Sequence, residues 1–126
     1  MSVPRRVLIV DDEATFTRLV KMNLEAGGAY EVREESHGER ALAAAQAFHP
    51  DVILLDVIMP DMDGHQIAAQ LAADAQLASV PIIFLTATVM KRGVETSPTS
   101  LAGRPVIPKP VSMSELRSRL ETIVRA

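Results

Sequence analysis

The feature that most constrains the fold is a short aliphatic run that recurs along the chain and is followed each time by a polar residue. The runs are Val7–Val10, Val52–Leu55 and Ile82–Leu85, and the residues that follow them are Asp11, Asp56 and Thr86. Runs that are apolar on both faces indicate strands that helices cover on both sides, as in a parallel sheet. Val106–Ile107 is a shorter run of this kind, and the alternation in Tyr30–Arg33 suits an edge strand.

Between these runs, apolar residues recur at intervals of three or four positions, which predicts amphipathic helices. The four stripes are Phe16, Val20 and Leu24; Ala41, Leu42, Ala45 and Phe48; Ile67, Ala68, Leu71 and Ala72; and Leu116, Leu120, Ile123 and Val124. We expect Gly27 and Gly28 to end the first helix and Pro50 the second. Ser112 or Ser114 is expected to cap the last helix. Because strands and helices alternate, we predict an α/β fold with a doubly wound, five-stranded parallel sheet.

The segment between Thr88 and Arg104 departs from this pattern. It is rich in glycine, serine and proline, and its few apolar residues are Val89, Met90, Val94 and Leu101. Glycine and proline interrupt helices, and a helix without an apolar stripe has no face to bury. We therefore expect the fourth helix of the alternating pattern to be short, broken or missing.

Length, composition and charge narrow the class of protein. The 126 residues suit a single domain over residues 1–126, and the absence of cysteine excludes disulfides and thiolate metal sites. The net charge is −3 without a basic tail, so this chain is not expected to bind nucleic acid. No apolar stretch is long enough for a membrane helix or a signal peptide. We therefore expect a soluble, cytoplasmic protein with no membrane contact.

Several of the polar residues that follow strands are aspartates. In an open α/β sheet, ligands bind outside the carboxyl ends of the strands, where the strand order reverses. With the strand order 2-1-3-4-5, Asp11, Asp12 and Asp56 would share one cleft, and their like charges would need a cation. Mg²⁺ binds carboxylates together with water and phosphate oxygens, and it is the predicted cofactor. Each aspartate also has a structural alternative as a turn or N-cap residue.

Four segments of the chain resemble the receiver domain of two-component response regulators. They are Val7–Glu13, Asp51–Gly64, Phe84–Ala87 and Pro108–Pro110, and their order and spacing are those of that family. The resemblance extends from about Val7 to the C-terminus. It implies a flavodoxin-like fold with the strand order 2-1-3-4-5. It also implies a phosphoprotein of a phosphorelay, which receives its phosphoryl group from a sensor histidine kinase or a phosphotransfer protein.

The resemblance assigns an acceptor and a set of metal ligands. Asp56 matches the aspartate that accepts the phosphoryl group and also faces the metal. Asp12 matches the direct Mg²⁺ ligand, and Asp11 matches the aspartate that usually acts through water. The backbone carbonyl of Ile58 would be a further ligand. The expected chemistry is that of a signalling switch that catalyses its own phosphorylation and slow dephosphorylation, not that of an enzyme with turnover.

Two further positions match residues that contact the phosphoryl group. Thr86 matches the hydroxyl that binds a phosphoryl oxygen after transfer, and Lys109 matches the lysine that pairs with the acceptor and then with the phosphate. Such groups stabilise the charge on the transferring oxygens. The resemblance also implies a cis bond between Lys109 and Pro110, which would aim the ammonium inward. Taken alone, Thr86 could only cap its strand and Lys109 could be a solvated loop residue.

Two positions depart from the pattern of the family. Val106 stands three residues before the lysine, where relatives usually carry tyrosine or phenylalanine, and valine has no ring that could swing inward. Together with the irregular segment 91–104, it predicts normal phosphorylation with an unusual output surface. Ile58 is apolar, whereas relatives use this position and Thr88 to tune the attack of water. We therefore predict a long-lived phosphoryl group.

Two other functions stay open from the sequence. A pseudo-receiver would keep the fold as a binding module without phosphorylation. A haloacid-dehalogenase phosphatase would use Asp61–Gly64, which resembles the start of the motif of that family but follows a proline. Because no output domain follows Ala126, the expected effect passes through contacts with another protein, unless the chain is a fragment.

Overall fold

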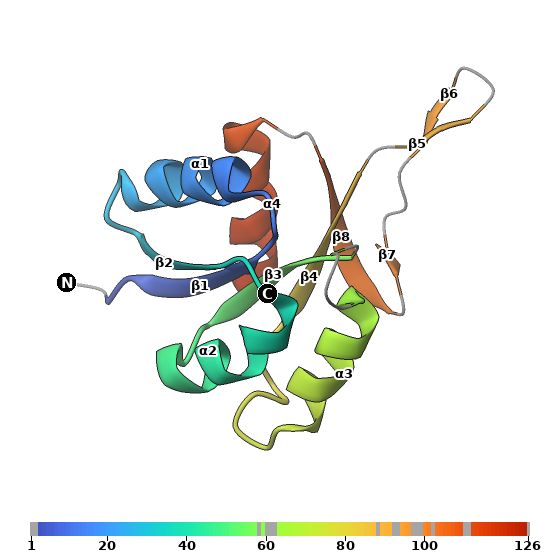
Figure 1. The fold of residues 1–126 in the computed structure, drawn as a ribbon. Coiled ribbons are helices and arrows are strands. Elements are labelled where there is room, and N and C mark those ends of the chain that lie inside the picture. Colours follow the sequence, from blue (N-terminus) through green and yellow to red (C-terminus); the bar gives the residue numbers. More distant parts are fainter. Residues whose placement is uncertain are drawn as a thin grey trace.

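The computed structural model describes residues 3–57, 59, 63–87, 89–91, 94–96, 100–101, 103–109 and 112–125. Strands and helices alternate over most of this length (Figure 1). The strands are β1 Arg5–Val10, β2 Tyr30–Glu35, β3 Val52–Asp56, β4 Ile82–Ala87, β5 Val89–Lys91, β6 Val94–Thr96, β7 Ser100–Leu101 and β8 Arg104–Lys109. The helices are α1 Ala14–Glu25, the short 3₁₀ helix η1 Gly38–Arg40, α2 Ala41–Phe48, α3 Gly64–Ala73 and α4 Met113–Arg125.

The main sheet has six strands in the order β2-β1-β3-β4-β8-β7. Strands β2, β1, β3, β4 and β8 are parallel, whereas β7 pairs antiparallel with β8 at the edge. Since β8 is the fifth strand of the alternating pattern, the predicted five parallel strands in the order 2-1-3-4-5 are confirmed. The strand order reverses between β1 and β3, so their carboxyl ends lie side by side where such sheets bind ligands.

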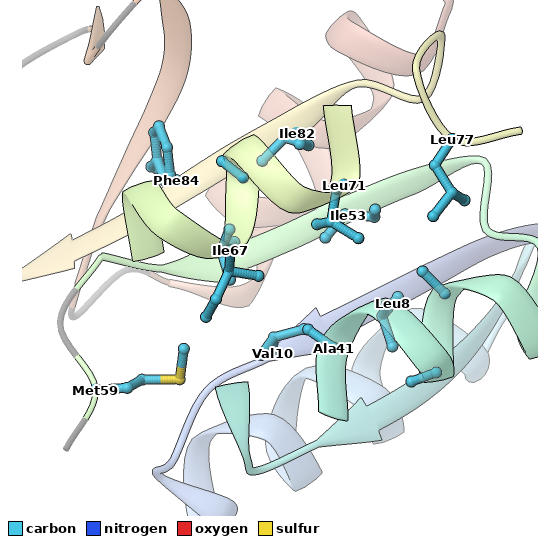
Figure 2. Packing of buried hydrophobic residues seen from close by; sticks show 14 of the residues in the cluster. Leu8, Val10, Ala41, Ile53, Met59, Ile67, Leu71, Leu77, Ile82 and Phe84 are labelled. Atoms are coloured by element: carbon cyan, nitrogen blue, oxygen red, sulfur yellow. The ribbon is translucent and has the colours of Figure 1, made fainter. Parts of the chain in front are cut away.

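Two aliphatic cores lie on opposite faces of this sheet, because successive residues of a strand point to opposite sides. Leu8 and Val10 of β1 pack with α2 and α3, as Figure 2 shows. Val7 and Ile9 of the same strand pack with α1 and α4 on the other face. All four side chains are fully buried. Burial on both faces explains why the strands are unbroken apolar runs in the sequence.

Local signals set the helix ends. The helix α2 stops at Phe48, and His49 adopts a left-handed conformation with φ of 55° immediately before Pro50. The predicted stop at the proline is therefore correct to within two residues, because proline disfavours a helical conformation in the residue before it. At α4, the backbone N–H of Glu115 donates to Ser112 Oγ at 3.1 Å. Ser112, and not Ser114, is therefore the N-cap.

The segment between β4 and β8 interrupts the alternation. Strands β5 and β6 pair antiparallel as a hairpin that projects away from the sheet in Figure 1. Within the described part of this segment there is no helix, which agrees with the expectation of a short, broken or missing fourth helix. The helix that the sequence predicted last is therefore α4. None of the helices in the described ranges is long and apolar enough to cross a membrane.

Candidate functional site

The carboxyl edge of the sheet gathers the polar residues that follow the strands. Val10 pairs with Leu55 in the register of β1 and β3, so Asp11 and Asp56 come next to each other on neighbouring strands. One carboxylate oxygen from each of Asp11, Asp12 and Asp56 lies within 4.8 Å of the others. Asp11 is fully buried, Asp56 is nearly so, and Asp12 is exposed. The structure thus brings together the three aspartates that the sequence placed in one cleft.

This donor set fits a divalent cation. Three carboxylates at this range repel one another, and a hard cation with oxygen ligands removes the repulsion. Asp11 Oδ1 accepts a hydrogen bond from the backbone N–H of Glu13 at 2.9 Å, and Asp11 Oδ2 accepts one from Lys109. Both oxygens of Asp11 therefore already accept hydrogen bonds, whereas the side chain of Asp12 is exposed to solvent. The predicted carbonyl ligand, Ile58, lies outside the described residues.

Lys109 reaches the cluster from the end of β8. Its ammonium nitrogen lies 2.7 Å from Asp11 Oδ2, 2.6 Å from Glu13 Oε1 and 3.8 Å from Asp56 Oδ2. It also lies 4.8 Å from the centre of the Phe16 ring, within the range of a cation–π contact. Burial alone would lower the pKa of Lys109, but hydrogen bonds to Asp11 and Glu13 outweigh it and raise the pKa above its ordinary value. The lysine therefore carries its positive charge at neutral pH.

Thr86 lies on β4, the neighbour of β3, and Val106 lies on β8, the next strand along the sheet. Leu85 pairs with Asp56 in the register of β3 and β4, so Thr86 lies one residue beyond the level of Asp56 and is half-buried. Val106 pairs with Phe84 and is buried in the core beneath α3. It is a fixed packing residue in this structure, as expected from its branched side chain. Pro110 and Thr88 lie outside the described residues, so the predicted cis bond does too.

Gly64 allows α3 to begin directly against the end of β3. Its backbone N–H donates to Val57 O at 2.9 Å, and a Cβ at this position would lie 2.5 Å from Asp56 O. The structural reason for a glycine here is therefore the close approach of two backbone segments. Asp63 caps α3 by accepting a hydrogen bond from His65 N at 2.7 Å. Asp63 thus acts as a helix N-cap, and Asp61, where the resemblance to the phosphatase motif begins, lies outside the described residues.

Sequence reasoning missed two residues that contact Lys109. Glu13 directly follows the paired aspartates, and Phe16 was counted only in the apolar stripe of its helix. Their contacts with Lys109 span more than ninety positions of the chain, so no local pattern reveals them. The only sequence feature that could have indicated a role for Glu13 is its position directly after Asp11 and Asp12. The three histidines, His37, His49 and His65, are exposed.

Comparison with known proteins gives the family. The sequence profile of the response regulator receiver domain matches residues 7–121. PhoP of Bacillus subtilis, an alkaline phosphatase synthesis transcriptional regulatory protein, is 36% identical over 125 residues, which cover 96% of this chain and 49% of PhoP. TrcR of Mycobacterium tuberculosis, a transcriptional regulatory protein, is 40% identical over 124 residues, covering 97% of this chain and 46% of TrcR. The chain thus spans about half the length of these curated relatives.

A solved structure agrees with the sequence relatives. The chemotaxis response regulator CheY4 of Vibrio cholerae superposes with a TM-score of 0.80 at 30% sequence identity. The superposition covers 95% of this chain and 98% of the CheY4 chain. Profile, sequence relatives and fold agree over nearly the whole chain. The chain therefore belongs to the response regulator receiver domains, the phospho-accepting signalling switches of two-component systems.

Proposed function

We propose that residues 1–126 act as one receiver domain that accepts a phosphoryl group on Asp56 in a reaction that requires Mg²⁺. The observation that carries the proposal is the cluster at the carboxyl edge. Oxygens of Asp11, Asp12 and Asp56 lie within 4.8 Å of one another, and the Lys109 ammonium lies 3.8 Å from Asp56 Oδ2. Concentrated negative charge beside one fixed positive charge suits a hard divalent cation and a phosphoryl group.

The metal ligands in this proposal are Asp12, Asp56 and the backbone carbonyl of Ile58, with Asp11 acting through water. Both oxygens of Asp11 already accept hydrogen bonds, which supports its indirect role. When bound, Mg²⁺ would supply positive charge to the transferring phosphoryl oxygens. Asp12 is exposed and can approach an ion from solvent without breaking a buried contact.

The transfer itself forms one bond and breaks one. A carboxylate oxygen of Asp56 bonds to phosphorus, while the bond from phosphorus to the imidazole nitrogen of a donor phosphohistidine breaks and the nitrogen keeps the electron pair. Lys109 then pairs with one phosphoryl oxygen, and the hydroxyl of Thr86 donates to another. Positioning and charge stabilisation of this kind account for most of the catalysis of phosphoryl transfer. The raised pKa of Lys109 keeps its ammonium charged for this role.

The proposed donors are a sensor histidine kinase or a phosphotransfer protein in the cytoplasm. The relatives PhoP and TrcR are named as transcriptional regulators, and this chain matches about half of each. For this chain we propose that phosphorylation changes a surface to which a downstream protein binds. The acyl phosphate would bias two arrangements of the loops at the carboxyl edge. In this proposal the chain itself contacts neither nucleic acid nor a membrane.

Intact-protein mass tests the acceptor. The chain is incubated with acetyl phosphate, with and without Mg²⁺, as wild type, Asp56→Asn and Asp51→Asn. Asp51 is a matched control because it precedes β3 just as Asp56 ends it, and it lies at the opposite edge. A single phosphoryl adduct in wild type and Asp51→Asn, lost in Asp56→Asn and without Mg²⁺, supports the proposal. An adduct that persists in Asp56→Asn contradicts it.

The lifetime of the adduct tests the role assigned to Ile58. This residue offers no polar side chain to orient an attacking water, so the proposal includes slow loss of the phosphoryl group. The adduct is followed by mass after removal of the donor. Loss within seconds would contradict this part of the proposal, and faster loss in Ile58→Asn than in wild type would support it.

A further inference from the structure

Lys109 lies closer to Glu13 and Asp11 than to the proposed acceptor. The distances from its nitrogen are 2.6 Å to Glu13 Oε1 and 2.7 Å to Asp11 Oδ2, against 3.8 Å to Asp56 Oδ2. The first two are short, charge-assisted hydrogen bonds, whereas the third exceeds hydrogen-bond length. In this state the ammonium therefore donates hydrogen bonds to Glu13 and Asp11, and its contact with Asp56 Oδ2 is a longer ion pair.

The backbone around Glu13 is fixed, so its side chain has a defined origin. Its N–H donates to Asp11 Oδ1 at 2.9 Å. Its carbonyl accepts from Phe16 N at 3.0 Å and from Thr17 N at 3.1 Å, in the first turn of α1. The Phe16 ring covers the ammonium from the same turn. Glu13 itself is 63% exposed on its side chain, so its carboxylate can leave Lys109 without being buried elsewhere.

We infer that Glu13 is a positioning residue that holds the Lys109 ammonium away from Asp56 until a phosphoryl group arrives. This inference rests on the proposed function, in which Lys109 moves onto a phosphoryl oxygen. A lysine that has to leave Glu13 before it binds the phosphoryl group makes the phosphorylated arrangement less favourable. Glu13 thus lowers the affinity of the site for a phosphoryl group and limits activation in the resting state.

The test measures the affinity of the site for beryllofluoride, a stable mimic of the acyl phosphate, at saturating Mg²⁺. Glu13→Gln removes the charge, and Glu13→Asp keeps the charge but shortens the side chain by one methylene group, which withdraws it from Lys109. Both variants are expected to bind beryllofluoride about two- to fivefold more tightly, the range for an ion pair with one exposed partner. Glu35→Gln is the control, because Glu35 ends β2 beside Val10 and bonds to His37 N.

A second measurement follows the ammonium group itself by NMR. The chain has only three lysines, Lys21, Lys91 and Lys109, so the ammonium spectrum is simple. Lys21 is an internal reference, since it donates to Glu25 Oε2 at 2.9 Å and to Val32 O at 2.7 Å. The Lys109 signal, assigned by its loss in Lys109→Gln, is expected to exchange faster with water in both Glu13 variants. The Lys21 signal is expected to stay unchanged.

The outcomes separate this inference from the proposed function. Tighter beryllofluoride binding in both Glu13 variants, with faster exchange at Lys109 alone, supports the inference. Tighter binding in Glu13→Gln and Glu35→Gln but not in Glu13→Asp would reveal general charge repulsion and overturn it. An unchanged Lys109 signal would also overturn it. If the wild-type chain binds no beryllofluoride, the proposed function fails, and the ammonium signals alone decide whether Glu13 holds Lys109.

Discussion

The two ends of β3 place the same residue type in opposite environments. Asp51, just before the strand, is exposed, and its carboxylate accepts a hydrogen bond from Arg6 N at 2.8 Å while its own N–H donates to Arg6 O at 2.7 Å. Asp56, the last residue of the strand, is 7% exposed and shares a cleft with two other carboxylates. At the amino end an aspartate completes the backbone pairing, whereas at the carboxyl end it adds to a concentration of charge.

Asp51 therefore stabilises the fold through its hydrogen bond, whereas Asp56 adds an unfavourable charge that the fold has to accommodate. A chain selected only for stability gains nothing from three neighbouring carboxylates, because each raises the free energy of the others. Departures from locally favourable structure of this kind are expected at functional sites. The same edge holds Gly64, whose lack of a side chain permits α3 to start against Asp56. Three predictions test the contrast between the two edges, and a fourth concerns a carboxylate outside the aspartate cluster.

The largest expected effect comes from filling the space at Gly64. In Gly64→Ala the new Cβ would meet the backbone of Asp56 at 2.5 Å, so the start of α3 has to shift. We expect a loss of about 3 kcal/mol in the free energy of unfolding, the upper part of the usual range for overpacking. Gly27→Ala is the control, since its Cβ would meet only Arg117 at an ordinary 3.6 Å. Urea unfolding of the two variants checks this, and equal losses would contradict it.

The second largest effect is expected on Mg²⁺ affinity, which should depend on aspartates at the carboxyl edge and not on Asp51. We expect Asp12→Asn to weaken Mg²⁺ binding by about 10–100-fold, a loss typical even of groups that only support a metal ligand. Asp51→Asn should leave the affinity unchanged, because its carboxylate bonds to Arg6 at the other edge. Calorimetric titration of both variants with Mg²⁺ measures this. Similar affinities for the two variants would place the ion elsewhere.

Stability without Mg²⁺ should change in opposite directions at the two ends of β3. Asp56→Asn removes one of three clustered charges, so we expect a gain of about 1 kcal/mol in the free energy of unfolding at low salt. Asp51→Asn weakens a charge-assisted hydrogen bond to Arg6 and should cost about 0.5 kcal/mol. Adding Mg²⁺ should stabilise wild type but not Asp56→Asn. Destabilisation of both variants in the absence of Mg²⁺ would contradict the expected opposite effects at the two ends of β3.

The smallest effect concerns Glu25, a carboxylate that accepts hydrogen bonds from Lys21 and from Val32 N. A hydrogen bond from Val32 N, helped by Lys21, lowers the pKa of Glu25 below its ordinary 4.5 despite a contribution from burial that raises it. A lowered pKa means that its stabilising effect is present above pH 4.5 and disappears as the pH falls through the lower, folded-state pKa. Because Glu25 is partly exposed, we expect Glu25→Gln to cost only about 0.5 kcal/mol at pH 7.

Urea unfolding at a series of pH values checks this last prediction. The difference between wild type and Glu25→Gln should shrink as the pH falls below 4.5. A difference that is constant down to the acid transition would show that the carboxylate charge is not what stabilises this contact. Glu31→Gln, at an exposed position of β2, is a matched control without that hydrogen bond pattern.

Much of this molecule could be predicted from its sequence because the strands are buried on both faces. Asp11 and Asp56 follow unbroken apolar runs, so their place at the carboxyl edge depends only on strand pairing. The role of Gly64 could not be predicted, since the close approach depends on where α3 packs. Glu13 and Lys109 are 96 positions apart, and only the folded sheet brings them together. The hairpin of β5 and β6 could not be predicted either, because it has too few apolar residues to form the alternating pattern that indicates a strand.

Locating the phosphoryl group within the chain tests the central claim most directly. The protein is phosphorylated with acetyl phosphate and Mg²⁺, the acyl phosphate is reduced with borohydride, and peptide mapping identifies the residue converted to an alcohol. Conversion is expected at Asp56 alone, with Asp51, Asp11 and Asp12 unmodified. Conversion at Asp51, or at several aspartates without preference, would contradict the assignment of the carboxyl edge as the phospho-accepting site.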